Sequence, residues 1–430
     1  MRKTYLRSLF VVLLAALMLM TSSAYSQDNP VTIKVMGHSV HESAVTGGAG
    51  VGYDMSNDIL QATGVSLVWE TQPWPDILER TVRELALSKS DISLMFLISQ
   101  QYSPQVRSQL TPLNDFLASE PIENFDGIAE GMISYVSDSS GNIYGIPMRA
   151  YGPVLFYNTE IMAQNGITEP PTTWEEYIAD SKATSGRRED GARIYGMRFE
   201  PSSVILAARA YGGDVLSPDF KILFTDEPMI HALKEAAELY ADGVIPPDFM
   251  NLVADDWLTL EQNGQVAFSV RGPTYYNNLN DPDASQVVGK IGVTVVPASE
   301  TVDFDLVPGD AAFWSMSIPK NSANPEAAWA VIRYLSSDAG AKAMALNGNA
   351  PTKLSVYDDP DFAKVNAAWA GPASQSLKVA RPYWPAFDEQ PRAQDIFNEQ
   401  VVLAVTGQKS PEDAMADAAK QIEPLLPTAE

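Results

Sequence analysis

Apolar and polar positions along the chain follow two periods, one typical of strands and the other of helices. Residues 31–36 alternate as a strand does, and further apolar runs at 65–69 and 91–98 predict two more strands. Helical spacing separates them at 54–63, after a Gly-rich loop, and at 77–88. This βαβαβ order predicts an α/β sheet whose ligands bind at the carboxyl edge of its strands.

A second pattern begins where the chain is expected to cross to another sheet. The apolar run 154–157 lies between a Gly-Pro pair and an Asn, which predicts a buried strand. Pro170-Pro171 then keeps the chain extended up to Thr172. The Thr172 hydroxyl is expected to cap a helix, with Glu175 bonding back to its amide.

The rest of the chain keeps alternating between the two periods. Helical spacing covers 228–241, and strands are predicted at 266–270 and 289–296. Asn324-Pro325 opens a helical segment that ends near Asn347, and Ser410-Pro411 opens the final helix.

The N-terminus has the order of a secretory signal peptide. Three basic residues precede an apolar stretch from Leu9 to Met20, and small residues follow up to Ser26. The stretch is too short to span a bilayer comfortably, so residues 1–26 are expected to be cleaved. The chain has no cysteine, hence no lipidation site or disulfide. We expect a free periplasmic protein and not a lipoprotein.

The net charge and the length of the chain limit its possible functions and its domain organisation. The formal net charge is −25, and removal of the basic signal peptide makes the mature chain more acidic still. Nucleic-acid binding needs a basic face and is disfavoured. The chain exceeds the size at which one core keeps growing, and no Pro-, Gly- or Ser-rich linker divides it. Two lobes joined by several crossings fit this better than tethered domains.

Five segments together resemble the extracellular solute-binding proteins, the family that includes the maltose-binding protein. They are Ser90-Asp91-Ile92, the run from Gly141 to Glu176, Asn263–Phe268 with Arg271-Gly272-Pro273, Ser317–Lys320, and Asn324–Trp329. The resemblance implies a type II periplasmic-binding-protein-like fold, with two α/β lobes joined by a multi-crossing hinge around a ligand cleft. It implies capture of a small solute by lobe closure and delivery to the permease subunits of an ABC importer. A monomer without cofactor or metal is expected.

The same resemblance implies how the chain divides. The first lobe would hold residues 27–148 and 298–347, and the second lobe residues 149–297 and 348–430.

Sugar recognition needs flat apolar faces together with directional hydrogen-bonding groups. Arg149 and Tyr151 on the hinge are the first expected polar contacts, unless they form an exposed loop pair. Arg271, Tyr275 and Tyr276 follow where relatives place a stacking Trp, but this chain has Thr274 at the nearest match. A tyrosine is therefore expected to take that role.

Further candidates flank expected strands and loops. His38 follows the first strand, and its position fits a capping or buried structural histidine as well as a ligand contact. Phe96 lies near the end of the third strand, where a core residue is more typical than a site residue. Trp314 is expected either to stack on ligand or to seal its lobe. Arg381 and Trp384 lie in a loop stiffened by two prolines, which favours a presented ring, and Trp384 ranks first. Trp74 has the same chemistry at the first lobe's edge.

Other functions remain open at this point. If Arg149, Arg271 and Arg381 converged, an anionic sugar derivative would fit, because a guanidinium matches an oxyanion. An enzyme would have to work with three histidines and no cysteine, and the His38/His41 pair lacks a third metal ligand on a suitable pattern. A secreted carbohydrate-active hydrolase is the distant alternative. The expected ligand is a small carbohydrate or sugar alcohol.

Overall fold

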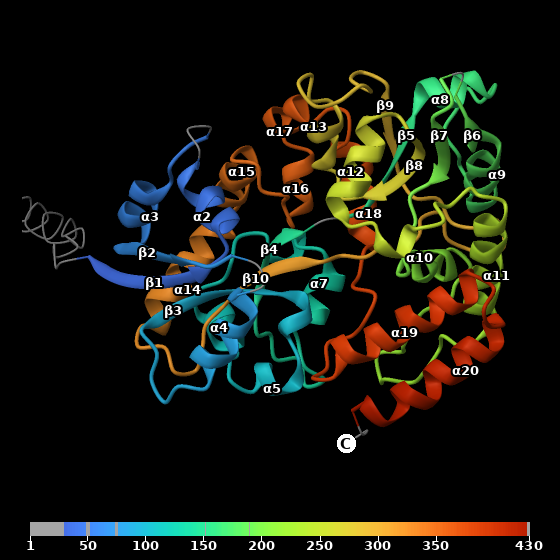
Figure 1. The fold of residues 1–430 in the computed structure, drawn as a ribbon. Helices are drawn as coiled ribbons and strands as arrows, with labels where there is room; N and C mark the ends of the chain where they lie inside the picture. Colours follow the sequence, from blue (N-terminus) through green and yellow to red (C-terminus); the bar gives the residue numbers. More distant parts are fainter. Residues whose placement is uncertain (1–29, 49–51, 74–75, 151, 189, 428–430) are drawn as a thin grey trace, which may run out of the picture.

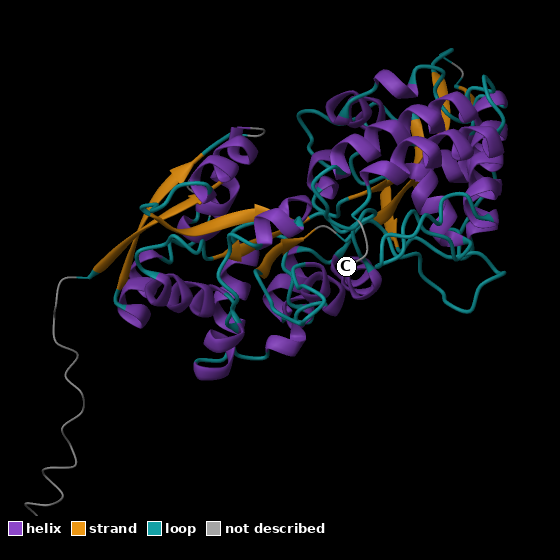
Figure 2. Cartoon of the chain, turned by 90° about the horizontal axis from the view of Figure 1, so that it is seen from below, coloured by secondary structure: helices purple, strands orange, loops and turns teal. Residues whose placement is uncertain are grey.

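The structure is a computed structural model that describes residues 30–48, 52–73, 76–150, 152–188 and 190–427. Its strands form two five-stranded sheets, each covered by helices, and the two resulting bodies lie side by side (Figure 1). Seen at 90° to this view, they are joined by chain segments in the middle of the molecule (Figure 2). No helix among the described residues is long and apolar enough to cross a membrane.

The first sheet has the order β2-β1-β3-β10-β4. Strand β1 runs parallel to β2 and β3, whereas β10 is antiparallel to both β3 and β4. Strands β1 to β4 therefore all point the same way. Their bounds are Val31–Gly37 (β1), Val65–Thr71 (β2), Ile92–Ile98 (β3), Ile146–Ala150 (β4) and Phe313–Ser317 (β10).

The second sheet has the order β6-β7-β8-β5-β9. Strands β7 and β8 are parallel, and β5 is antiparallel to β8 and β9. The bounds are Val154–Asn158 (β5), Gly186–Arg187 (β6), Arg193–Met197 (β7), Val266–Arg271 (β8) and Ile291–Thr294 (β9).

Helices cover both sheets, and around each sheet they come from two separate stretches of the chain. Around the first sheet lie Ser39–Thr46 (α2), Ser56–Thr63 (α3), Asp76–Leu85 (α4), Pro104–Arg107 (α5), Asn114–Ser119 (α6), Glu130–Tyr135 (α7), Pro325–Leu335 (α14) and Asp338–Leu346 (α15). Around the second lie Thr159–Gln164 (α8), Trp174–Thr184 (α9), Ser203–Ala210 (α10), Glu227–Ala241 (α11), Ala254–Gln262 (α12), Tyr275–Leu279 (α13), Gln390–Val405 (α19) and Pro411–Ile422 (α20).

Three short helices connect the two bodies: Leu354–Tyr357 (α16), Pro360–Val365 (α17) and Ala370–Val379 (α18). Helix α18 contacts α7 of the first body and β5 of the second. Each body has its own buried cluster, and a third cluster runs between them from Ile92 through Phe156 to Trp369. This shared packing joins the two bodies through side chains as well as through the connecting backbone.

The predicted strands and helices are present in the predicted order, and the structure adds elements that were not predicted, among them α2, α10, α12, β4 and β7. Some details also differ. Thr173, not Thr172, caps α9, since its hydroxyl accepts from the amide of Glu176. The segment after Asn324 forms two helices. Helix α14 ends at Leu335, and the hydroxyl of Ser337 accepts a hydrogen bond from the amide of Gly340 and so caps α15. Trp314 lies within β10, which begins at Phe313.

Candidate functional site

The carboxyl ends of the parallel strands meet between the two sheets. In the first sheet these ends are Gly37, Ile98 and Ala150, and β10 enters at the same edge because Phe313 pairs with Ala150. In the second sheet Arg271 ends β8 and pairs with Val154, the first residue of β5. Only residues 151–153 separate β4 from β5. The two carboxyl edges therefore adjoin, which is where open α/β sheets bind ligands.

A stack of rings lies at the edge of the first sheet. The buried His41 is stacked on Phe96, with ring centroids 4.6 Å apart, and meets Trp314 edge to face at 4.5 Å. Gly37 makes this packing possible, since a Cβ there would lie 3.1 Å from His41 Nδ1 and 3.2 Å from Phe96. Trp314 is 9% exposed and Phe96 is fully buried, so Phe96 supports the edge from behind.

His38 begins the helix that carries His41. Its Nδ1 accepts a hydrogen bond from the amide of Val40 at 3.2 Å, so His38 is the N-cap of α2. In turn the His38 amide donates to His41 Nδ1 at 3.0 Å. This bond fixes the proton of neutral His41 on Nε2, which is buried and without a hydrogen-bond partner among the described residues.

Arg149 lies next to this stack on β4. It is paired across the sheet with Trp314, and its Nη1 donates to Asn349 Oδ1 at 3.0 Å. Asn349 is itself buried and donates to the carbonyl of Met148 at 2.7 Å, which holds the amide in place. Burial lowers the pKa of both His38 and His41, and the nearby positive charge of Arg149 lowers it further.

We predict a specific loss of stability in mild acid from His41. Burial holds its pKa well below the ordinary value of 6.5 in the folded protein, so only the unfolded chain takes up this proton as pH falls below 6.5. The free energy of unfolding then falls by at most about 1.4 kcal/mol for each unit by which the pH is lowered. Urea unfolding between pH 7.5 and 5 should show a flatter slope for His41→Leu than for wild type. His231→Leu, at an exposed histidine, is the control, and equal slopes for all three proteins would contradict the prediction.

At the second sheet's edge, Arg271 does not offer a free charge. Its guanidinium forms an ion pair with Glu261, and both side chains are buried, at 2% and 4% exposure. Its Nη2 donates to the carbonyl of Ala254 at 3.3 Å, and Tyr275 lies 3.6 Å from it, ring centroid to Cζ. Tyr275 and Tyr276 are partly buried on α13. Arg271 therefore anchors α12 and Tyr275 to the strand edge.

Arg381 is also paired, farther along the second body. It bonds Asp214 at 3.0 Å, and Asp214 also holds the buried Arg209 at 3.0 Å. Arg209 also donates to the carbonyls of Pro308 and Pro382, each at 2.8 Å. The condition for an anionic ligand was that Arg149, Arg271 and Arg381 converge, but Arg271 and Arg381 already have carboxylate partners.

The expectation that two prolines present Trp384 is wrong. The ring is 4% exposed and packs edge to face on Phe397, with centroids 5.6 Å apart, in the core of the second body. Its backbone carbonyl accepts a 2.8 Å hydrogen bond from the hydroxyl of Tyr135 in α7. Trp174 and Trp329 are buried as well. Trp74 and Tyr151 lie outside the described residues.

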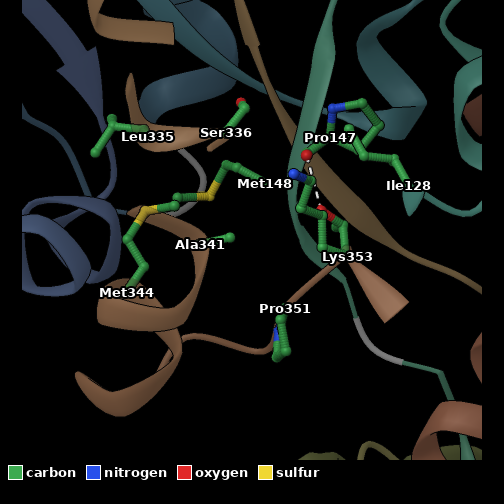
Figure 3. Close-up of a pocket in the computed structure, with 10 residues that line it drawn as sticks. Ile128, Pro147, Met148, Leu335, Ser336, Ala341, Met344, Pro351 and Lys353 are labelled. Carbon is green, nitrogen blue, oxygen red and sulfur yellow. Dashed lines mark hydrogen bonds between the residues drawn. The ribbon is translucent and has the colours of Figure 1, made fainter. Parts of the chain in front are cut away.

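A small cavity behind β4 is too small to be the ligand site. It is lined by Met148, Met344 and Lys353, among others, and the centres of water-sized spheres can occupy about 10 Å³ of it (Figure 3). Such a space holds about one water molecule. The hydroxyl of Ser336, which lines it, is buried and unpartnered among the described residues, so one water fits its chemistry.

Four of the sequence candidates are thus brought together at the first edge: His38, Phe96, Arg149 and Trp314. Sequence reasoning missed His41 and Asn349 as parts of this arrangement. The spacing of three between His38 and His41 was a signal for the first, because residues three apart on a helix face the same side. Among the described residues no three His, Cys, Asp or Glu side chains are placed to hold a metal.

Comparison with known proteins assigns the chain to a family. Residues 54–370 match the family model of bacterial extracellular solute-binding proteins. A probable amino-acid ABC transporter periplasmic-binding protein of Sinorhizobium fredii is 22% identical over 437 residues, covering 98% of each chain.

Solved structures show the same fold. A solute-binding protein of Agrobacterium radiobacter in complex with ribitol superposes with a TM-score of 0.73 at 20% identity, covering 93% of this chain and 99% of that one. Maltose-bound MalE3 of T. maritima superposes with a TM-score of 0.70 at 22% identity, covering 92% of this chain and 100% of that one. With the family model matching most of its length, the chain belongs to the bacterial extracellular solute-binding proteins.

Proposed function

We propose that the protein captures a small uncharged carbohydrate or sugar alcohol between the two sheet edges and delivers it to the permease subunits of an ABC importer. The observation that carries this is the edge of the first sheet, where Trp314, 9% exposed and backed by the buried His41, lies beside Arg149. Flat rings stack on C–H faces, and a guanidinium donates to hydroxyls in fixed directions. No step of chemistry is needed from these groups, so the role is binding and not catalysis.

Charge favours a neutral solute over an anionic sugar. Arg271 and Arg381 have carboxylate partners, so the second body contributes no unpaired guanidinium from these two positions. The relatives support the same class in part, since two similar structures hold ribitol and maltose, whereas one relative bears the name of an amino-acid transporter. An amino acid is therefore the second candidate solute.

The remaining features of the proposal follow from the sequence. The signal peptide expected at 1–26 and the absence of cysteine support a protein without a lipid anchor in the periplasm, and we propose that it is a monomer. We propose lobes at 27–148 with 298–347, and at 149–297 with 348–430, and the grouping of the strands into two sheets supports this division. Strand β4 extends through Ala150, two residues past the proposed boundary.

Thermal unfolding against a panel of sugars, sugar alcohols, sugar acids and amino acids tests the solute class. A ligand at 1,000 times its Kd adds about 4 kcal/mol, enough to raise the Tm by several degrees. We expect a shift with one neutral sugar or sugar alcohol. A shift with amino acids alone, or with sugar acids alone, would overturn the proposed class.

Arg149→Met tests the site itself. We expect the Kd for the identified solute to rise at least tenfold, because a directional donor to its hydroxyls is lost, worth about 1.4 kcal/mol or more. Calorimetric titration measures this, with Arg392→Met as the matched control, since Arg392 is 69% exposed on α19. Equal affinity of Arg149→Met and Arg392→Met would remove Arg149 from the site.

A further inference from the structure

A second cavity lies inside the second body, apart from the ring stack on the first sheet. It is enclosed by α9, α10 and α11, at the right of Figure 1, and it reaches the carboxyl edge at Arg198 and Val270. The centres of water-sized spheres can occupy about 40 Å³ of it. That is room for roughly three water molecules, which is close to the volume of one aromatic ring.

The walls of this cavity are flat and apolar. Trp174 and Tyr177 come from α9, Leu206 from α10, and Ala236 and Leu239 from α11, and all five are buried. Protein interiors are close-packed, and spaces larger than one water are few per domain. An apolar space of this size is disfavoured for water, because each buried water needs two to four polar partners.

The cavity has one unsatisfied donor, the Nε–H of Arg198, which is buried and has no partner among the described residues. The other guanidinium nitrogens are engaged: Nη1 donates to the carbonyl of Val270 at 3.2 Å, and Nη2 pairs with Glu200. A buried N–H without an acceptor is costly, so the cavity calls for an oxygen at this point. Its charge is already balanced by Glu200.

The other ionisable group in the wall, Glu235, demands no ligand. One carboxyl oxygen accepts from Trp174 Nε1 at 2.9 Å and the other from the hydroxyl of Tyr211 at 2.9 Å. Burial raises the pKa of Glu235, so a charge on this group is disfavoured. The cavity therefore combines aromatic walls, one donor and no free charge.

We propose that this cavity is a second binding site, which takes a small uncharged aromatic molecule carrying one oxygen acceptor, of the size of phenol. The ring would lie among Trp174, Tyr177 and Leu206, with its oxygen accepting from Arg198 Nε. The site does not depend on which solute binds between the two sheets. Nothing in its wall matches the many hydroxyls of a sugar.

Titration with phenol, and with benzoate and glucose as charged and polar comparisons, tests the proposal. We expect phenol to bind wild type and to bind Ala236→Leu at least tenfold more weakly, because the added side chain occupies the space of the ring. Ala237→Leu is the matched control, one residue along the same helix and outside the cavity wall. Arg198→Met should weaken phenol and leave a non-hydrogen-bonding ring such as benzene less affected.

Several results would overturn the proposal: no phenol binding, equal binding to Ala236→Leu and Ala237→Leu, preference for benzoate or glucose, or crystals soaked in phenol that show only water in the cavity. If Ala236→Leu does not fold, Ala207→Val on the wall formed by α10 makes the same comparison. The thermal shift with the carbohydrate should persist in Ala236→Leu. Failure of the phenol site and failure of the carbohydrate site are thus read out separately.

Discussion

Replacing Trp384 with alanine should lower the free energy of unfolding by about 3–5 kcal/mol, the usual cost of truncating a buried Trp. The ring is 4% exposed, packs against Phe397 and belongs to the core cluster of the second body. Its removal leaves a cavity that the surrounding α19 side chains fill only in part. Urea unfolding followed by circular dichroism measures the change, and Trp384→Phe should cost clearly less because it keeps one ring in place.

The same variant separates a packing role from a role in solute binding. We expect the folded fraction of Trp384→Ala to bind its solute with nearly wild-type affinity, because the ring faces the core. An unchanged unfolding midpoint combined with a loss of solute affinity would contradict this. That outcome would return Trp384 to the site, where its proline-flanked loop first placed it.

The alternation of periods predicted the opening βαβαβ unit and several later elements, and it failed at α2, where the buried face is not wholly apolar. Helix α2 buries His41 together with Ala44 and Val45, and a histidine at a core position hides the helical period. Its C-cap, Gly47, has a φ of 74°, a left-handed conformation typical of the end of a helix. The break between α14 and α15 was missed because Ser336-Ser337 interrupts a segment whose composition stays helical.

Predicting the site was harder, since residue types are local but their partners are not. The partner of Arg149, Asn349, lies 200 positions away, and the partner of Arg381, Asp214, lies 167 positions away. Whether an arginine offers its charge to a solute depends on such partners. Trp384 shows the same limit, because prolines on either side fix the backbone but do not determine which way the ring points.

The stability of the second body should depend strongly on the buried pair of Arg271 and Glu261. Glu261→Ala leaves the Arg271 guanidinium buried at 2% exposure without its carboxylate, and we expect a loss of about 3–5 kcal/mol in stability. The hydroxyl of Ser269 loses its acceptor in the same variant. Urea unfolding measures the loss, and Glu160→Ala is the control, because its pair with Lys290 is largely exposed and worth about 1 kcal/mol or less.

A second variant shows whether the loss comes from the unpaired charge or from the missing side chain. Glu261→Leu combined with Arg271→Met removes both charges and keeps most of the buried volume. A buried ion pair replaced by apolar groups of similar volume is often neutral in stability, so this double variant should recover most of the loss. Equal destabilisation of the double variant and of Glu261→Ala would show that packing on β8, and not charge, is responsible. If Glu261→Ala cost no more than Glu160→Ala, Arg271 would have an alternative partner and would again be a candidate for direct contact with the solute.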